Sequence, residues 1–129
     1  MLELIDQPGG AEKVARKLEE ARQRDPKAVL FAEVVVNLIG YEHLQSGDAK
    51  GAVEILKLNA AAFPSSPNVF DSLGDAYLAA GERELARQSS QKALDLLASD
   101  TSDPDERRKL IRISAEEKLK QLGGAPSPQ

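Results

Sequence analysis

The chain contains no cysteine and no tryptophan, and aromatic residues make up only 4% of it. Without cysteine there is no disulfide framework, no thiolate metal site and no cysteine nucleophile. With so few aromatic side chains, aliphatic residues and alanine must form the core, which favours close helix–helix contacts over a sheet sandwich. The absence of cysteine fits a reducing compartment, and the start of the chain, MLELIDQPGG, shows no signal peptide. Both observations favour a cytoplasmic location.

Long apolar runs and an excess of positive charge are also missing. No apolar stretch approaches the roughly 20 residues that span a bilayer, so we expect a soluble protein with no membrane partner. The formal net charge is −4, and residues 31–102 hold 10 acidic and 5 basic side chains. This balance argues against a nucleic-acid partner. The one basic stretch, from Arg107 to Lys120, is interleaved with Glu106, Glu116 and Glu117, a pattern typical of a solvated helix.

Residues and motifs that carry chemistry are scarce. The single histidine, His43, would have to serve any Ser-His-Asp triad, and no second histidine exists to share a metal. Ser89 and Lys92 form an S-x-x-K motif, but the companion S-D-N and K-T-G motifs of that enzyme class are absent. We therefore expect His43 to occupy a packing position, and Ser89 and Lys92 to lie on a solvated helix face. The sequence predicts no catalytic, cofactor-binding or metal-binding residue, and hence no enzyme.

Glycine and proline divide the chain into about six helical segments. The expected helices cover residues 11–24, 28–45, 48–63, 67–80, 82–98 and 104–122. Asp48 is a suitable N-cap, and Pro67 suits the first turn of a helix. The triplet Val34–Val36 is strand-like, but it lies inside a longer helical pattern with no turn signals beside it. Residues 123–129 are rich in Gly, Pro and Ser, and we expect them to form a disordered tail.

The chain repeats itself with a period of 34 residues. The aligned pairs are Val36 and Phe70, Ile39 and Leu73, Gly40 and Gly74, His43 and Tyr77, Gly47 and Gly81, and Ala52 and Ala86. Each unit is a helix, a glycine-containing turn and a second helix. The glycine inside the first helix and the alanine in the second permit close approach of the paired helices. The glycine between the helices permits a tight reversal.

At these positions the sequence resembles the tetratricopeptide repeat. The second unit fits that pattern well, except that Ser90 replaces a large apolar residue and Ala98 replaces the closing proline; the first unit is looser. Val14, Leu18 and Ala21 have the spacing of the second helix of a degenerate preceding unit. The resemblance implies an all-α fold, a right-handed stack of antiparallel helix pairs. It implies one domain, residues 1–122, with a half-repeat at 11–26, repeats at 33–66 and 67–100, and a capping helix at 104–122.

In this family the first helix of each pair lines a concave groove. The resemblance therefore implies a non-catalytic scaffold that binds a peptide or protein surface, although the chain's own first or last helix could fill the groove instead. Asn37 and Asp71 could hydrogen-bond a peptide backbone, and basic clamp residues are missing, which favours a neutral or basic peptide over an acidic one. The positions expected to face the groove are Val34, Asn37, Tyr41, Leu44, Gln45, Asn68, Asp71, Asp75, Leu78 and Ala79.

A narrower resemblance leads to a second hypothesis. The runs EVVVNLIGYEHL and LKLNAAAFPSSPNVFDSLGDAY are similar to repeat segments at the C-terminus of bacterial serine hydrolases of the penicillin-binding and β-lactamase type. This likeness implies an accessory or dimerisation domain of such a hydrolase. The helix expected at 28–45 is apolar nearly all round and about one turn longer than its counterpart, so we expect it to project. Leu30, Phe31 and Val35 would then mediate self-association into a homodimer.

Overall fold

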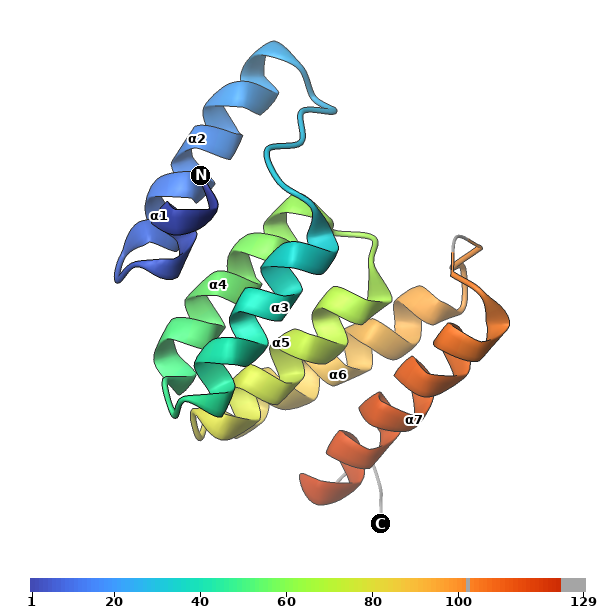
Figure 1. Ribbon diagram of the computed structural model, residues 1–129. Coiled ribbons are helices and arrows are strands. Elements are labelled where there is room, and N and C mark those ends of the chain that lie inside the picture. Colours follow the sequence, from blue (N-terminus) through green and yellow to red (C-terminus); the bar gives the residue numbers. More distant parts are fainter. Residues whose placement is uncertain (102, 124–129) are drawn as a thin grey trace. The chain divides into compact units, whose positions relative to one another are not determined.

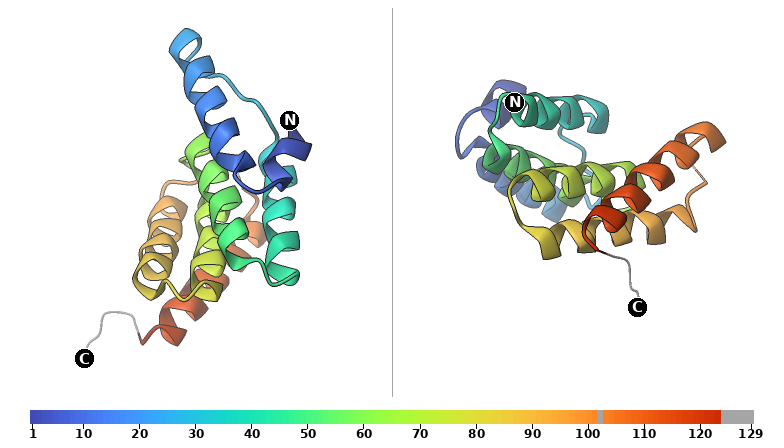
Figure 2. Two further views of the ribbon diagram at one scale, coloured as in Figure 1. Left: turned by 90° about the vertical axis from the view of Figure 1, so that its left-hand side faces the viewer. Right: turned by 90° about the horizontal axis from the view of Figure 1, so that it is seen from below.

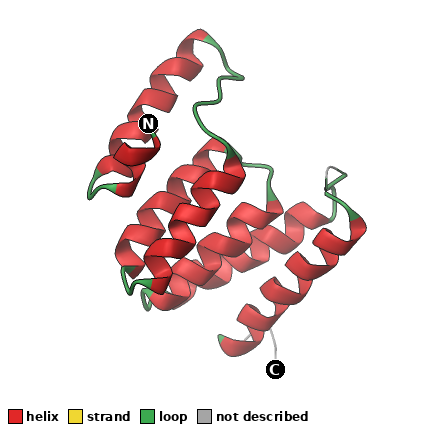
Figure 3. Ribbon diagram, viewed as in Figure 1, coloured by secondary structure: helices red, strands yellow, loops and turns green. Residues whose placement is uncertain are grey.

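The computed structural model describes residues 1–101 and 103–123. This part of the chain forms seven helices and no strand (Figures 1 and 3). The helices are α1 (Leu2–Asp6), α2 (Gly10–Arg24), α3 (Glu33–Gln45), α4 (Ala49–Ala62), α5 (Pro67–Ala79), α6 (Arg83–Leu97) and α7 (Asp105–Gln121). The expectation of an all-α fold is confirmed. Of the tail expected at 123–129, all but Gly123 lies outside the described residues.

The chain falls into two compact units, Met1–Pro64 (unit 1) and Ser65–Gln129 (unit 2). Unit 1 contains α1 to α4, and unit 2 contains α5 to α7. The division between residues 64 and 65 lies close to the expected limit between the two repeats. The stacking of one repeat on the other concerns the relation between the units, so it stays a prediction.

Short turns join the helices of each antiparallel pair, α3 with α4 and α5 with α6 (Figure 1). Gly47 and Gly81 adopt φ angles of +88° and +79° in these turns, a left-handed conformation that glycine reaches without steric cost. Asp48 caps α4 by accepting a hydrogen bond from the Gly51 amide at 3.0 Å. Pro67 is the first residue of α5. The expected helix–turn–helix units, and their punctuation, are therefore confirmed.

The two pairs repeat the same close contact between their helices. A Cβ atom at Gly40 would lie 2.7 Å from the Leu56 side chain, and one at Gly74 would lie 2.8 Å from Ser90 Oγ. Leu56 and Ser90 are themselves 34 residues apart and both are fully buried. Ser90 is smaller than Leu56, and the aliphatic part of Lys118 also reaches this point, with its Cε atom 3.2 Å from the same Cβ position.

The predicted start of the long helix at Ala28 is wrong. Helix α3 begins at Glu33, and the residues before it link α2 to α3 without helical structure. Phe31 is buried in this link, with its ring edge-on to that of Phe63 at a centroid distance of 6.0 Å. Arg22 holds the link, because its Nε donates to the Ala28 carbonyl at 3.2 Å. The surplus residues therefore form a link that is anchored by the buried Phe31, and no helical turn projects.

Helix α1 is an element that the sequence pattern did not predict. It contains only five residues, and its Ile5 is almost fully buried in the core of unit 1. The chain turns back so closely here that a Cβ atom at Gly10 would lie 1.6 Å from the Leu4 carbonyl oxygen. Helix α2 packs against α1 on one side and against α4 on the other. Arg22 secures the second contact, since its Nη2 donates to the Ala62 carbonyl at 2.7 Å, at the end of α4.

In unit 2, the last helix packs across the helix pair. Helix α7 contacts both α5 and α6 (Figure 2), and it buries Ile111, Ala115 and Leu119. Near its start, Arg108 Nη2 donates to the Leu97 carbonyl at 3.1 Å, at the C-terminus of α6. Helix α7 thus covers one side of unit 2.

Candidate binding surfaces

Helix α3 carries the groove positions expected in unit 1. Val34 is 67% exposed, and Gln45 is also exposed. The other expected groove positions on this helix, Asn37, Tyr41 and Leu44, are half-buried. Beside them, Leu38 is 59% exposed and Val35 is exposed as well. We call Val34, Val35 and Leu38 the α3 strip, the apolar surface that unit 1 leaves open on this helix.

The α3 strip remains open because of how unit 1 packs. Helix α3 buries Val36 and Gly40 against its neighbours, whereas α2 packs mainly against α4. Although α3 is apolar nearly all round, it is therefore not buried on every side. Val34 and Leu38 are one turn apart, and the next position on this stripe is the exposed acid Glu42. The helix itself contains no lysine or arginine.

Two of the groove positions expected on α5, Asp71 and Asp75, are occupied from within unit 2. Lys118 of α7 is 4% exposed, and its Nζ lies 2.9 Å from Asp71 Oδ1, 2.9 Å from Asp75 Oδ1 and 2.9 Å from Ser114 Oγ. Asp71 is buried by this contact, while Asn68 and Leu78 are half-buried and Ala79 is exposed. Asp71 is thus used to hold the capping helix and is not presented to a peptide.

The surroundings of Asp71 change its titration. Burial raises the pKa of Asp71 above its ordinary value, and the ion pair with Lys118 lowers it without cancelling that effect. From the sequence pattern, Lys118 was expected to lie in a solvated basic stretch, and that interpretation is wrong for this residue. The sequence did contain a signal for the burial of Lys118, since this residue follows Ile111 and Ala115 at the spacing of one helix face. That face packs on α5 and α6.

The residues expected to mediate self-association do not form one surface. Phe31 is buried and Leu30 is half-buried in the core of unit 1. Val35 alone is exposed, and it belongs to the α3 strip. The structure therefore removes Leu30 and Phe31 from the surface on which a homodimer was expected.

His43 lies at the boundary of unit 1 between two carboxylates. Its Nε2 is 2.7 Å from Asp6 Oδ1 and its Nδ1 is 2.8 Å from Asp48 Oδ2. Both contacts form hydrogen bonds with good geometry only when both ring nitrogens carry protons. Partial burial lowers the pKa of His43, but the hydrogen bonds and charges of Asp48 and Asp6 outweigh it, so the pKa is raised. The bridge ties α1 to the turn between α3 and α4.

The S-x-x-K motif is not arranged as a solvated pair. Ser89 is buried, contrary to the expectation, and Lys92 Nζ lies 5.9 Å from the centre of the Phe70 ring. In residues 1–101 and 103–123, no three His, Cys, Asp or Glu side chains gather where they could hold a metal ion. Within the same ranges, no helix has the length and apolar content needed to cross a membrane.

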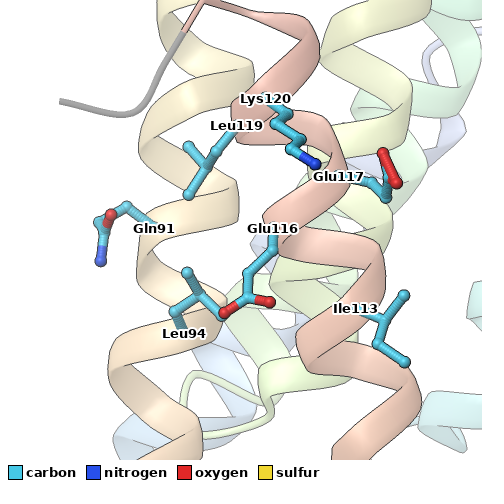
Figure 4. A pocket seen from close by; sticks show the side chains of 7 residues that line it. All are labelled: Gln91, Leu94, Ile113, Glu116, Glu117, Leu119 and Lys120. Carbon is cyan, nitrogen blue, oxygen red and sulfur yellow. The ribbon is translucent and has the colours of Figure 1, made fainter. Parts of the chain in front are cut away.

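A further surface, which sequence reasoning did not single out, lies between α6 and α7 (Figure 4). It is a groove of about 500 Å³ lined by Gln91, Leu94, Ile113, Glu116, Glu117, Leu119 and Lys120. Beside it on α7, Leu110 is 67% exposed and Ile113 is 49% exposed. Leu110 and Ile113 belong to the helix at 104–122, which was expected to cap the stack.

No known family model matches this chain, and no curated protein matches it either.

Proposed function

We propose that this chain is a tetratricopeptide-like interaction scaffold with no chemistry of its own, and that α3 carries its binding surface. The α3 strip is the observation that supports this proposal most directly, because Val34 and Leu38 expose large apolar side chains on a regular helix. The repeated glycine contacts, Gly40 with Leu56 and Gly74 with Ser90, support the repeat assignment. Rigid paired helices suit such a role, since little conformational entropy is lost on binding.

The ligand is best described as a peptide segment with apolar side chains followed by a basic one. The stripe on α3 runs from Val34 through Leu38 to Glu42, all exposed. Two apolar side chains of a ligand would cover the valine and the leucine, and a lysine or arginine would meet the carboxylate. The lack of basic residues on α3 disfavours an acidic ligand. The proposal thus keeps a neutral or basic peptide as the partner and confines the site to unit 1.

A selection of random peptides on the full chain tests this proposal. We expect enriched peptides to combine apolar residues with Lys or Arg, and to lose binding by at least about 10-fold on the Val34→Asp/Leu38→Asp variant in calorimetry. Leu85→Asp is the matched control, because Leu85 is another exposed apolar side chain, on α6. Peptides that bind the wild type and the double variant equally would contradict the proposed site. Failure to enrich any peptide would contradict the proposed function.

The alternative role as an accessory or dimerisation domain of a serine hydrolase is less well supported. The self-association expected for it through Leu30 and Phe31 at a projecting turn loses support, because Phe31 is buried in the core of unit 1.

A further inference from the structure

The outer face of α7 carries apolar residues in its middle and charged residues before and after them. Leu110 and Ile113 are exposed at the centre of this face. Glu106 and Lys109 precede them, and the exposed residues Glu116, Glu117 and Lys120 follow. On an α-helix, steps of three, four and seven residues bring side chains to one side, so these residues share one face of α7, which we call the α7 face. A helix face with large apolar side chains in its middle favours packing against another helix.

The charges on the α7 face are complementary to the charges on the same face of a second copy that lies antiparallel to it. If two copies of α7 lie antiparallel with Ile113 at the two-fold axis, residues equally far before and after Ile113 come level. Glu106 then lies level with Lys120 of the second copy, and Lys109 lies level with Glu117 and next to Glu116. Each opposed pair occurs twice by symmetry. A two-fold interface requires such self-complementarity, because the same patch must match itself.

The groove between α6 and α7 fits this arrangement. At the level of Glu116 and Glu117, the side chain that arrives from the second copy is Lys109. Leu94 and Leu119, which lie between the two helices, suit its methylene stem, and the Glu116 carboxylate beside Leu94 suits its ammonium group (Figure 4). The groove is therefore shaped for a long side chain with an apolar stem and a cationic end.

We propose that the α7 face is the interface of a homodimer, in which two copies of α7 pack antiparallel about Ile113 and Lys109 of each copy enters the α6–α7 groove of the other. Helix α7 has 17 residues, which corresponds to a length of about 25 Å. A contact of one helix from each copy lies at the lower end of the size of protein interfaces. The dimer should therefore dissociate on dilution, and salt should weaken it because its ion pairs are at the surface.

Light scattering and sedimentation of the full chain across a concentration series provide the test. We expect the mass to rise with concentration from one to two chain masses. Lys109→Glu places an acidic side chain level with Glu116 and Glu117 of the second copy, and Glu116→Lys/Glu117→Lys places basic side chains level with Lys109, so each variant alone should remain monomeric. An equimolar mixture of the two variants should form a heterodimer, because the new acidic position of one variant then meets the new basic positions of the other. Lys57→Glu, an exposed charge reversal on α4, should dimerise like the wild type.

The mixture distinguishes a changed interface from misfolding, because a misfolded variant would not recover dimerisation when it is mixed with the other variant. A wild-type chain that stays monomeric throughout the series would overturn the proposal. So would a mixture that remains monomeric after circular dichroism shows both variants to be helical. A dimer that survives the α7 charge reversals but disappears in Val34→Asp/Leu38→Asp would assign the interface to the α3 strip, and would also overturn it. None of these outcomes decides whether the α3 strip binds a peptide, so the two proposals can fail independently.

Discussion

Replacing Lys118 by methionine should destabilise unit 2 more than any other exchange of a charged side chain on α7. The side chains of Lys118 and Asp71 are only 5% and 8% exposed, and their charged atoms lie 2.9 Å apart. Methionine keeps the aliphatic stem that crosses Gly74 and removes only the charge. Asp71 is then left as a buried carboxylate without its cation. Breaking a buried ion pair from one side typically costs about 3–5 kcal/mol, and we expect a loss of unfolding free energy in this range at neutral pH.

The pKa of Asp71 determines how the stability loss in Lys118→Met should change with pH. The folded-state pKa of Asp71 is already raised, so the stability that this group contributes falls as the pH rises from its ordinary value of 3.8 through the raised value. Without Lys118 the pKa must rise further. The deficit of Lys118→Met relative to the wild type should therefore be smallest near pH 4, close to the ordinary value of 3.8, and should grow toward about pH 7 as the carboxyl of Asp71 loses its proton.

Urea unfolding followed by circular dichroism at both pH values measures this deficit. Arg112→Met is the control, because Arg112 is exposed on the same helix outside the α7 face and its loss should change the stability by no more than about 0.5 kcal/mol. Equal stability of the two variants at neutral pH would refute the claim that Asp71 depends on Lys118. A deficit that does not change with pH would show that it arises from packing and not from the buried carboxylate.

Two further predictions concern unit 1. Phe31→Ala should lower the unfolding free energy by about 3 kcal/mol or more, the usual effect of truncating a buried phenylalanine; a stable variant in urea unfolding would mean that Phe31 is not part of the core. His43→Gln should destabilise the chain below about pH 6.5 and have progressively less effect as the pH rises through the raised pKa of His43, because the bridge to Asp6 and Asp48 needs the protonated ring. The protection of the α1 amides against hydrogen exchange, taken relative to the intrinsic exchange rate at each pH, should fall over the same interval in the wild type, and a protection that ignores this titration would contradict the bridge.

The sequence pattern predicted the features that depend on residues close together in the chain. The turns at Gly47 and Gly81 and the caps at Asp48 and Pro67 depend on residues only a few positions apart, and all four are as expected. The 34-residue period predicted the pairs of helices, because each pair repeats the same glycine contact.

Features that depend on contacts between distant segments were missed. The link before α3 has a continuous apolar pattern that suggests a helix, but burial of Phe31 against Phe63 and the bond from Arg22 to Ala28 fix it in another conformation. Helix α1 is too short for a periodic pattern to develop. The pairing of Asp71 with Lys118 joins residues on two different helices, and no local rule identifies such a partner.

The ion pair of Lys118 also specifies which repeat the last helix can cover. In the first repeat, the positions equivalent to Asp71, Asp75 and Ser90 are Asn37, Tyr41 and Leu56. Docked there, α7 would place its lysine beside an amide and a phenol, with no carboxylate to neutralise it, and its stem would meet a leucine in place of a serine. A buried charge without a partner is strongly disfavoured. The lysine therefore makes α7 fit the second repeat and not the first, although the two helix pairs repeat the same glycine contact.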